Sequence, residues 1–367
     1  MMKKVHWMIG TTLLASSILA GCGGSSTGSQ PANNSSNSNS TSTPPKQEEA
    51  KKEQAGTEKI VIKLGHTVAD TTSLQKGSLK FKEIVEQKSN GQMEVQVFPS
   101  SQLGNEKDMI EGNKLGTFQI SIPSAAMMSN FAPKAAVLAL PYVIKGENER
   151  EKFASLKKLA QSDAYKEIAT EAEAAGLKII PEAVWWYGDR QITTKGKEIA
   201  TPDALAGLKI RTPDAKAHTE PFKIMGANVT PMAFTEVYMA LSTGTIEAQE
   251  NPINTIYTSK FFEVQDTINL TGHMTQNQIP SISLKWWNTL SSEQQQIIKD
   301  AMIEAGDYQS EEQLKANEEE LGILEKNGMK VVKPDLNAFR EATKDTYKSF
   351  LDKFDQDFYE KIKKAQE

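Results

Sequence analysis

Residues 207–213 read Gly-Leu-Lys-Ile-Arg-Thr-Pro, and further along the chain residues 247–252 read Glu-Ala-Gln-Glu-Asn-Pro. Each stretch predicts a short strand that leads to a polar side chain, Arg211 at the end of the first and Asn251 just past the second. In open α/β sheets, ligands bind beyond the carboxyl ends of the strands. The guanidinium of Arg211 offers a planar fork of N–H donors that matches the two oxygens of a carboxylate. The two stretches therefore indicate an α/β fold with a site for a small organic anion.

Strand and helix patterns alternate on both sides of these stretches. Short β-branched or alternating segments predict strands, and apolar side chains at helical spacing predict helices. We predict strands over residues 60–64, 93–98, 119–122, 177–180, 191–194, 209–211 and 246–248, and helices over residues 74–87, 109–115 and 234–241. This rhythm restarts near Gly176 and predicts parallel α/β sheets. Thr201, as an N-cap before Pro202, predicts one further helical turn.

The C-terminal third of the chain has a helical pattern. Ser291 and Gln294 form a capping-box sequence, which predicts a long helix that runs toward Gly322 or beyond. A last helix is predicted from about residue 337 to the end. Its aromatic side chains lie largely on one face, which we expect to pack on the sheets.

Length and charge limit the classes of function. The chain has 367 residues, which is long enough for two domains. A formal net charge of −5 argues against nucleic acid as the main partner. It does not exclude a small anion, because a local arginine cleft can be positive on an acidic protein.

The N-terminus has the pattern of an export signal with a lipid-attachment site. Two lysines precede an apolar run over residues 5–20, which is too short to span a membrane as a mature helix. Residues 19–22 then read Leu-Ala-Gly-Cys and resemble a bacterial lipobox, which implies that Cys22 is lipidated. We therefore predict a lipoprotein signal peptide over residues 1–21. The alternative is an ordinary buried cysteine beside a signal peptide.

Residues 22–57 are rich in Ser, Asn, Thr, Gly and Pro and end in a Glu/Lys run. Such a segment cannot bury enough apolar surface to offset the entropy cost of folding, so we predict a disordered tether. With lipid on Cys22, the tether would hold the folded part at the extracytoplasmic face of the cell membrane. No other segment approaches the apolar length that crosses a membrane.

Arg211 is the first candidate ligand for a carboxylate, and a surface ion pair is the alternative. Arg190 is a second candidate, although Asp189 beside it could neutralise its charge. Asn251 could bind the anion or simply cap the turn before Pro252.

Three further candidates lie in or near aromatic segments. If residues 185–187 (Trp-Trp-Tyr) are extended, at least one ring must face away from the other two, and we expect one ring, Trp186, to line a cleft rather than the core. Glu236 and Tyr238 open a helix near the predicted site. A carboxylate also suits the positive end of a helix dipole, and for Glu236 we favour that structural role.

The sequence predicts no enzyme, metal site or cofactor. The histidines His6, His66, His218 and His273 have no metal-ligand spacing and no nucleophile elbow beside them. The sequence contains no Gly-rich phosphate loop between a strand and a helix, because its Gly23-Gly24 pair falls in the predicted tether.

With these residues identified, the chain resembles the extracytoplasmic solute receptor of a tripartite ATP-independent periplasmic (TRAP) transporter, of the DctP/SiaP-like type. The likeness covers roughly residues 60–305 and rests on seven segments in the same order. These are residues 90–104, 138–142 (Leu-Ala-Leu-Pro-Tyr), 188–194, 201–211, 226–232, 236–241 and 249–252 (Gln-Glu-Asn-Pro).

The resemblance implies a two-lobed, periplasmic-binding-protein-like α/β fold around a cleft, with hinge strands and a long helix lying across both lobes. We expect lobe I over residues 58–188 and about 277–316, and lobe II over residues 189–276 and about 317–367. The last part includes the C-terminal helices.

The resemblance also implies roles for single residues. Arg211 matches the arginine that bridges to the ligand carboxylate, Arg190 the family's second arginine, and Asn251 its ligand-binding asparagine. His66 precedes a loop that contributes to ligand choice. Asp189 departs from the apolar or aromatic residue often found in the family after Gly188.

The expected function is capture of a small organic acid, with a C4-dicarboxylate among the candidates, and its delivery to the membrane permease subunits of a TRAP-type transporter. Three alternatives stay open: the receptor of an ATP-driven (ABC) importer, a sensor subunit that presents ligand to a signalling kinase, and an extracytoplasmic enzyme.

Overall fold

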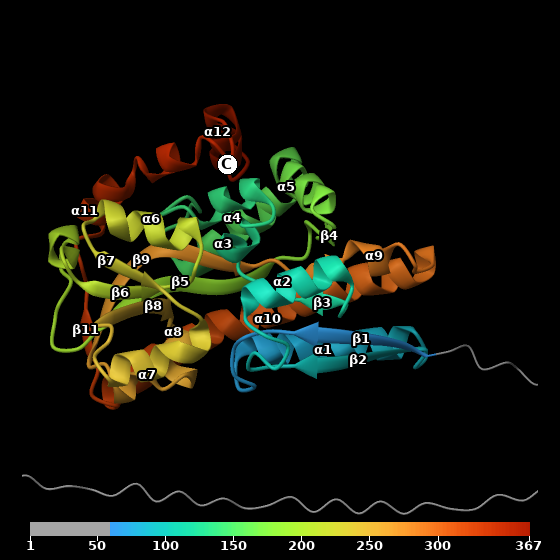
Figure 1. The fold of residues 1–367 in the computed structure, drawn as a ribbon, viewed down its shortest axis with the longest axis horizontal. Coiled ribbons are helices and arrows are strands. Elements are labelled where there is room, and N and C mark those ends of the chain that lie inside the picture. Colours follow the sequence, from blue (N-terminus) through green and yellow to red (C-terminus); the bar gives the residue numbers. More distant parts are fainter. Residues whose placement is uncertain (1–58) are drawn as a thin grey trace, which may run out of the picture. The chain divides into compact units, whose positions relative to one another are not determined.

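The computed structural model describes residues 59–367. The predicted signal peptide, Cys22 and the predicted tether lie outside the described residues. Within residues 59–367, the strands form one five-stranded and one six-stranded sheet (Figure 1). No helix in this part of the chain is long and apolar enough to cross a membrane.

The five-stranded sheet has the strand order β2-β1-β3-β10-β4. β1 (Ile60–Gly65) forms because its β-branched side chains suit a pleated, half-buried surface. It pairs in parallel with β2 (Met93–Phe98) and β3 (Ile120–Ser121), as the alternating pattern predicts. β10 (Ser281–Ser283) runs antiparallel to β3 and to β4 (Leu177–Lys178).

The six-stranded sheet has the strand order β11-β9-β5-β8-β6-β7. β6 pairs in parallel with β7 and β8, whereas β5 pairs antiparallel with β8 and β9. The prediction of purely parallel sheets is therefore wrong. The strand that precedes β5 in the chain, and likewise the strand that precedes β10, belongs to the other sheet. No crossover helix within one sheet therefore sets the direction of β5 or β10. The strands are β5 (Trp185–Thr194), β6 (Lys209–Thr212), β7 (Asn228–Pro231), β8 (Ala248–Pro252), β9 (Thr267–Gln278) and β11 (Lys330–Val332).

Helix α10 (Ser292–Lys326) connects the cores of the two sheets. It begins at the predicted capping box, because Ser291 accepts a hydrogen bond from the Gln294 N–H and the Gln294 side chain accepts one from the Ser291 N–H. Ile298 packs in the cluster around the five-stranded sheet, whereas Leu324 packs against the six-stranded sheet. The predicted two-lobed fold with a long helix spanning both lobes is confirmed. We call the elements around the five-stranded sheet lobe I and those around the six-stranded sheet lobe II.

Shorter helices flank both sheets (Figure 1). The α-helices are α1 (Ser73–Lys88), α2 (Glu106–Leu115), α3 (Ala125–Met128), α4 (Glu149–Ala160), α5 (Asp163–Ala174), α6 (Lys216–Ile224), α7 (Val237–Ser242), α8 (Ile253–Thr258), α9 (Leu284–Trp287), α11 (Leu336–Thr343) and α12 (Gln356–Lys364). The 3-10 helices are η1 (Pro133–Ala139), η2 (Pro202–Leu205), η3 (Phe234–Glu236), η4 (Phe261–Glu263) and η5 (Thr346–Phe350).

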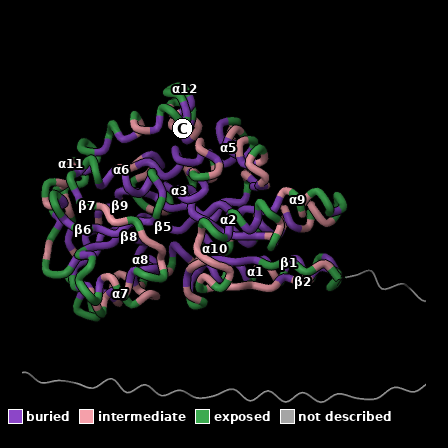
Figure 2. Tube along the Cα trace, in the orientation of Figure 1, coloured by how far each residue is buried: buried purple, intermediate pink, exposed green. Residues whose placement is uncertain are grey.

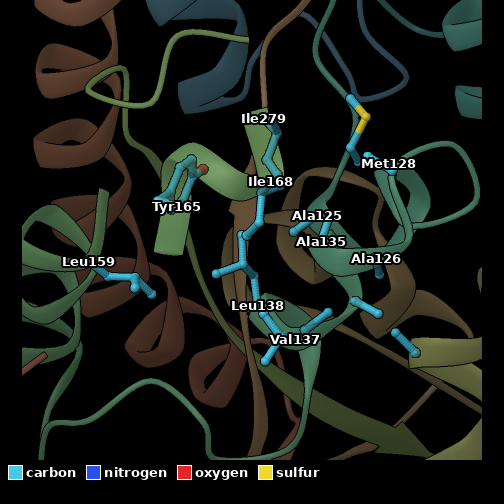
Figure 3. Packing of buried hydrophobic residues seen from close by; sticks show 14 of the residues in the cluster. Ala125, Ala126, Met128, Ala135, Val137, Leu138, Leu159, Tyr165, Ile168 and Ile279 are labelled. Carbon is cyan, nitrogen blue, oxygen red and sulfur yellow. The ribbon is translucent and has the colours of Figure 1, made fainter. Parts of the chain in front are cut away.

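The predicted last helix is broken into α11, η5 and α12. Asp355 starts α12 afresh by accepting a hydrogen bond from the Phe358 N–H at 2.7 Å. α11 contacts β9 as expected, but η5 contacts α6 and α12 contacts α5 instead of a sheet. Phe358 therefore joins the cluster of Tyr165 and Ile168, part of which Figure 3 shows.

Two local predictions are also corrected. Asn251, expected just past its strand, lies inside β8, because the ladder with β5 continues to Pro252. Thr201 makes no side-chain cap hydrogen bond to η2. Both β5 and β8 are buried along their whole length (Figure 2).

Candidate functional site

A cleft of about 430 Å³ lies between the two lobes at the end of β6. Its lobe I side comes mainly from the loop after β1 and the start of α2, and its lobe II side from the segments that follow β6 and β7. The lobe I lining is Thr67, Ser101, Gly104, Asn105, Glu106, Lys107 and Met127. The lobe II lining is Arg211, Pro213, Asp214, Pro231, Met232, Ala233, Phe234 and Thr235.

Arg211 is the buried cation of this cleft, with 2% of its surface exposed. β6 brings it there, and its Nε and Nη2 donate to the Met232 carbonyl oxygen at 3.1 and 2.6 Å. Its Nη1 has no hydrogen-bond partner among residues 59–367. Burial lowers the pKa of Arg211 to about 10, so the group stays charged at neutral pH. A buried guanidinium with an unused donor is suited to binding an anion.

Glu106 provides a carboxylate on the lobe I side of the cleft. It is the first residue of α2, which Asn105 caps by accepting a hydrogen bond from the Asp108 N–H at 3.1 Å. Its Oε1 accepts a hydrogen bond from the Ser124 N–H at 2.7 Å, and burial raises its pKa. Sequence reasoning missed Glu106, because an acidic residue in a first helical turn is ordinary. Its place two residues after the segment 90–104, which carries part of the family resemblance, was the available signal.

Arg190 does not line this cleft. It forms a buried ion pair with Glu250, in which Nε donates to Oε2 and Nη2 donates to Oε1 at 2.8 Å, and Nη1 donates to Gln276. His273 Nε2 lies 3.2 Å from Glu250 Oε2. Burial pushes the pKa of Glu250 up, but the Arg190 charge and the adjacent histidine hold it well below its usual range.

Asp189 is not the partner of Arg190, contrary to the expectation from sequence. Its carboxylate pairs with Lys152 and accepts a hydrogen bond from Thr275 Oγ1 at 2.7 Å. Neighbouring residues of a strand point to opposite faces, so adjacent Asp189 and Arg190 meet different partners.

The aromatic run of β5 alternates as predicted. Trp185 and Tyr187 pack in the lobe I cluster around α1. Trp186 packs in the cluster that contains Tyr165 and Ile168, where its ring centroid lies 6.2 Å from that of Phe153. None of the three rings lines the cleft at Arg211. Asn251 donates to Gln249 Oε1 at 2.6 Å and does not line it either.

Glu236 and Tyr238 lie beside the lobe II lining without being part of it. The Glu236 carboxylate accepts a hydrogen bond from the Ala233 N–H at 3.0 Å, which is the structural role favoured from sequence. The Tyr238 hydroxyl donates to Glu263 at 2.7 Å.

His66 is fully buried, and its Nε2 lies 2.7 Å from Gln75 Oε1. Burial lowers its pKa to about 4, so the ring is neutral at physiological pH. The next residue, Thr67, lines the cleft. Of the predicted site residues, the structure therefore brings only Arg211 to the cleft. Among residues 59–367 no group of three or more His, Cys, Asp or Glu side chains is arranged to hold a metal ion.

Comparison with known proteins gives consistent matches over most of the chain. Residues 64–353 match the family described as bacterial extracellular solute-binding protein, family 7. The sialic acid-binding periplasmic protein SiaP of Vibrio cholerae is 32% identical over 286 residues, which cover 76% of this chain and 85% of SiaP. The C4-dicarboxylate-binding periplasmic protein DctP of Rhodobacter capsulatus is 32% identical over 275 residues, which cover 74% and 79%.

A solved structure supports the same fold. The sugar acid binding protein DctPAm of Advenella mimigardefordensis, in complex with galactonate, superposes with a TM-score of 0.78 at 29% identity. The match covers 84% of this chain and 98% of that protein.

Proposed function

The chain belongs to family 7 of the bacterial extracellular solute-binding proteins, the receptors of TRAP-type transporters, and we propose that it binds a small organic acid between its lobes at Arg211. The observation that carries this proposal is the buried Arg211 guanidinium, which lines the cleft and has one donor group without a partner among the described residues. A ligand carboxylate would satisfy that donor and neutralise the buried charge.

We further propose that the acid carries hydroxyl groups. Glu106 places a second carboxylate on the opposite side of the cleft, together with the hydroxyl-bearing Thr67 and Ser101. The Glu106 carboxyl group can form hydrogen bonds with ligand hydroxyls, and its ionised form repels a second acid group. This arrangement favours a hydroxy or sugar acid over a C4-dicarboxylate.

The remaining steps of transport are part of the same proposal. The lobes close on the acid, because a ligand that contacts both lobes binds the closed form better than the open one. The closed receptor then delivers the acid, chemically unchanged, to a separate membrane permease. Lipid on Cys22 and the segment up to residue 57 would keep the receptor at the extracytoplasmic face of the membrane. The predicted lobe boundaries near residues 188, 276 and 316 belong to this proposal as well.

A thermal-melt screen of the purified protein tests the proposal. The panel contains galactonate, gulonate, sialic acid and succinate, with neutral sugars and amino acids as controls. A ligand at roughly a thousand times its dissociation constant adds about 4 kcal/mol to the free energy of unfolding. We expect a higher melting temperature with a hydroxylated acid and little change with succinate. A shift with neutral sugars and with no acid would refute the anion site.

A further inference from the structure

Two elements that connect the lobes meet close to Glu149. β5 contributes aromatic side chains to the lobe I cluster and Ile192 to the lobe II cluster, and α10 likewise reaches both cores. Glu149 is the first residue of α4 and lies beside both. β5 contains residue 189 and α10 contains residue 317, where the family resemblance leads us to expect two of the three lobe boundaries.

The Glu149 carboxylate holds these two elements together. Its Oε1 accepts a hydrogen bond from the Asp189 backbone N–H at 2.9 Å, and its Oε2 accepts one from Asn317 Nδ2 at 2.8 Å. One side chain of α4 is therefore bonded to the β5 backbone and to a side chain of α10. A rotation that moves Asp189 of β5 away from Asn317 of α10 would stretch one of these two bonds.

The β5 backbone is irregular at this point. Its register with β9 shifts between Trp186 and Gly188 and again between Arg190 and Ile192. Gly188 has a φ of 101°, and a Cβ there would lie only 2.4 Å from Asn317 Nδ2. The strand is thus locally distorted and closely approached by α10, as expected for a place where a strand bends.

A group of charges surrounds Glu149. Asp189 faces it from β5 and pairs with Lys152 of α4. Arg150 and Glu318 lie along the same groove of about 450 Å³, from α4 and α10 respectively. Arg150 bonds to Glu311 with two contacts of 3.2 Å, so it connects α4 to α10 a second time. The groove gives solvent protons access to Glu149.

We propose that Glu149 is a positioning residue at the hinge, whose gain or loss of a proton changes the angle between the lobes and thereby the affinity for ligand. The ionised carboxylate accepts both hydrogen bonds, one from β5 and one from α10. In the neutral acid one oxygen becomes a donor, so only one of the two hydrogen bonds keeps its full strength. Burial and the neighbouring Asp189 charge raise the pKa of Glu149 to about 7. Both forms are therefore populated near neutral pH. The link to affinity depends on the proposed function, but the change in lobe angle does not.

The test measures the distance between the lobes in the ligand-free full-length chain. Spin labels are attached at Leu79→Cys on α1 and Met239→Cys on α7, which are 47% and 62% exposed. Cys22→Ser removes the single native cysteine, so the two introduced cysteines are the only ones in the labelled chain and no lipid is attached at residue 22. Double electron–electron resonance then gives the distance distribution from pH 5.5 to 8.5. We expect the distribution to move with pH in this parent chain. In Glu149→Gln, the distribution should stay at the low-pH position of the parent.

Two matched variants separate this role from a general effect of charge. Glu318→Gln removes the same charge from the same groove without touching β5, so it should keep the parent's pH response. Lys152→Gln removes a cation that favours the ionised Glu149, so its midpoint should move to higher pH. A pH response that persists in Glu149→Gln, is absent from the parent, or is lost in Glu318→Gln would overturn the proposal. Because no ligand is used, failure of the organic-acid proposal leaves this result interpretable.

Discussion

Replacing Arg211 with methionine should abolish ligand binding while leaving the free protein about as stable as before. Burial lowers the pKa of Arg211 well below the ordinary value of an arginine, to about 10. At 1.36 kcal/mol for each pH unit, keeping this group charged costs the free protein about 3 kcal/mol. Methionine removes that cost and fills most of the same volume.

The substitution also loses the bonds from Nε and Nη2 to the Met232 carbonyl oxygen. Hydrogen bonds from a charged donor contribute about 1.5–3 kcal/mol. The two effects oppose each other and are similar in size, so we expect the melting temperature of the free variant to move by only a few degrees.

Binding behaves differently, because the ligand carboxylate loses its counter-charge in a desolvated cleft. Removing one partner of a buried ion pair costs about 3–5 kcal/mol, which weakens binding by roughly a hundredfold to several thousandfold. Isothermal titration calorimetry with the acid that gives the largest melting shift measures this change. Arg211→Lys keeps the charge but lacks the planar fork, so it should also bind poorly.

Arg340→Met is the matched control. It removes the same charge, but the Arg340 guanidinium lies over the Tyr142 ring at 4.6 Å and does not line the cleft. This control should bind as the wild type does. A dissociation constant for Arg211→Met within tenfold of the wild-type value would refute the assignment of the anion site to Arg211.

Three further outcomes are expected. Glu106→Gln should weaken binding of a hydroxylated acid such as galactonate by about tenfold to a hundredfold, because hydrogen bonds to a charged group are worth about 1.5–3 kcal/mol. Calorimetry measures this change, and succinate, which the wild type should bind only weakly, should bind the variant no more weakly than the wild type. Gly188→Ala should lower the free energy of unfolding in urea by more than the roughly 1–2 kcal/mol of strain that a side chain usually causes at positive φ. Gly196→Ala is the control, because Gly196 is also at positive φ but has nothing within 4 Å of its Cβ, and equal losses in the two variants would contradict the close approach of Asn317 to Gly188. Glu149 binds its proton more tightly in the folded protein than in the unfolded chain, so its stabilising contribution is complete below pH 4.5 and is lost as the pH rises to about 7. The loss is at most about 3 kcal/mol. The free energy of unfolding in urea should therefore differ less between pH 5 and pH 7.5 in Glu149→Gln than in the wild type, and an unchanged difference would count against the raised pKa.

Local patterns in the chain were enough to predict much of the fold. The β-branched run of β1, the alternation of β2 and the capping box at Ser291 each depend on residues that are neighbours in sequence. Arg211 was placed correctly at the end of β6 for the same reason, because a short apolar run stops there. The order of the motifs across the chain then identified the family and its two-lobed fold.

The partners of the charged residues could not be obtained in this way. Arg190 meets Glu250, which is 60 residues away, because β5 and β8 pair in antiparallel register. Asp189, its immediate neighbour, meets Lys152 of α4 on the opposite face of the strand.

Glu106 reaches the cleft of Arg211 only because the two lobes face each other there. Secondary structure follows from local periodicity and capping, so the order of residues is enough to determine it. The partner of a buried charge follows from strand register and lobe packing, which bring distant parts of the chain together, so only the folded molecule determines it.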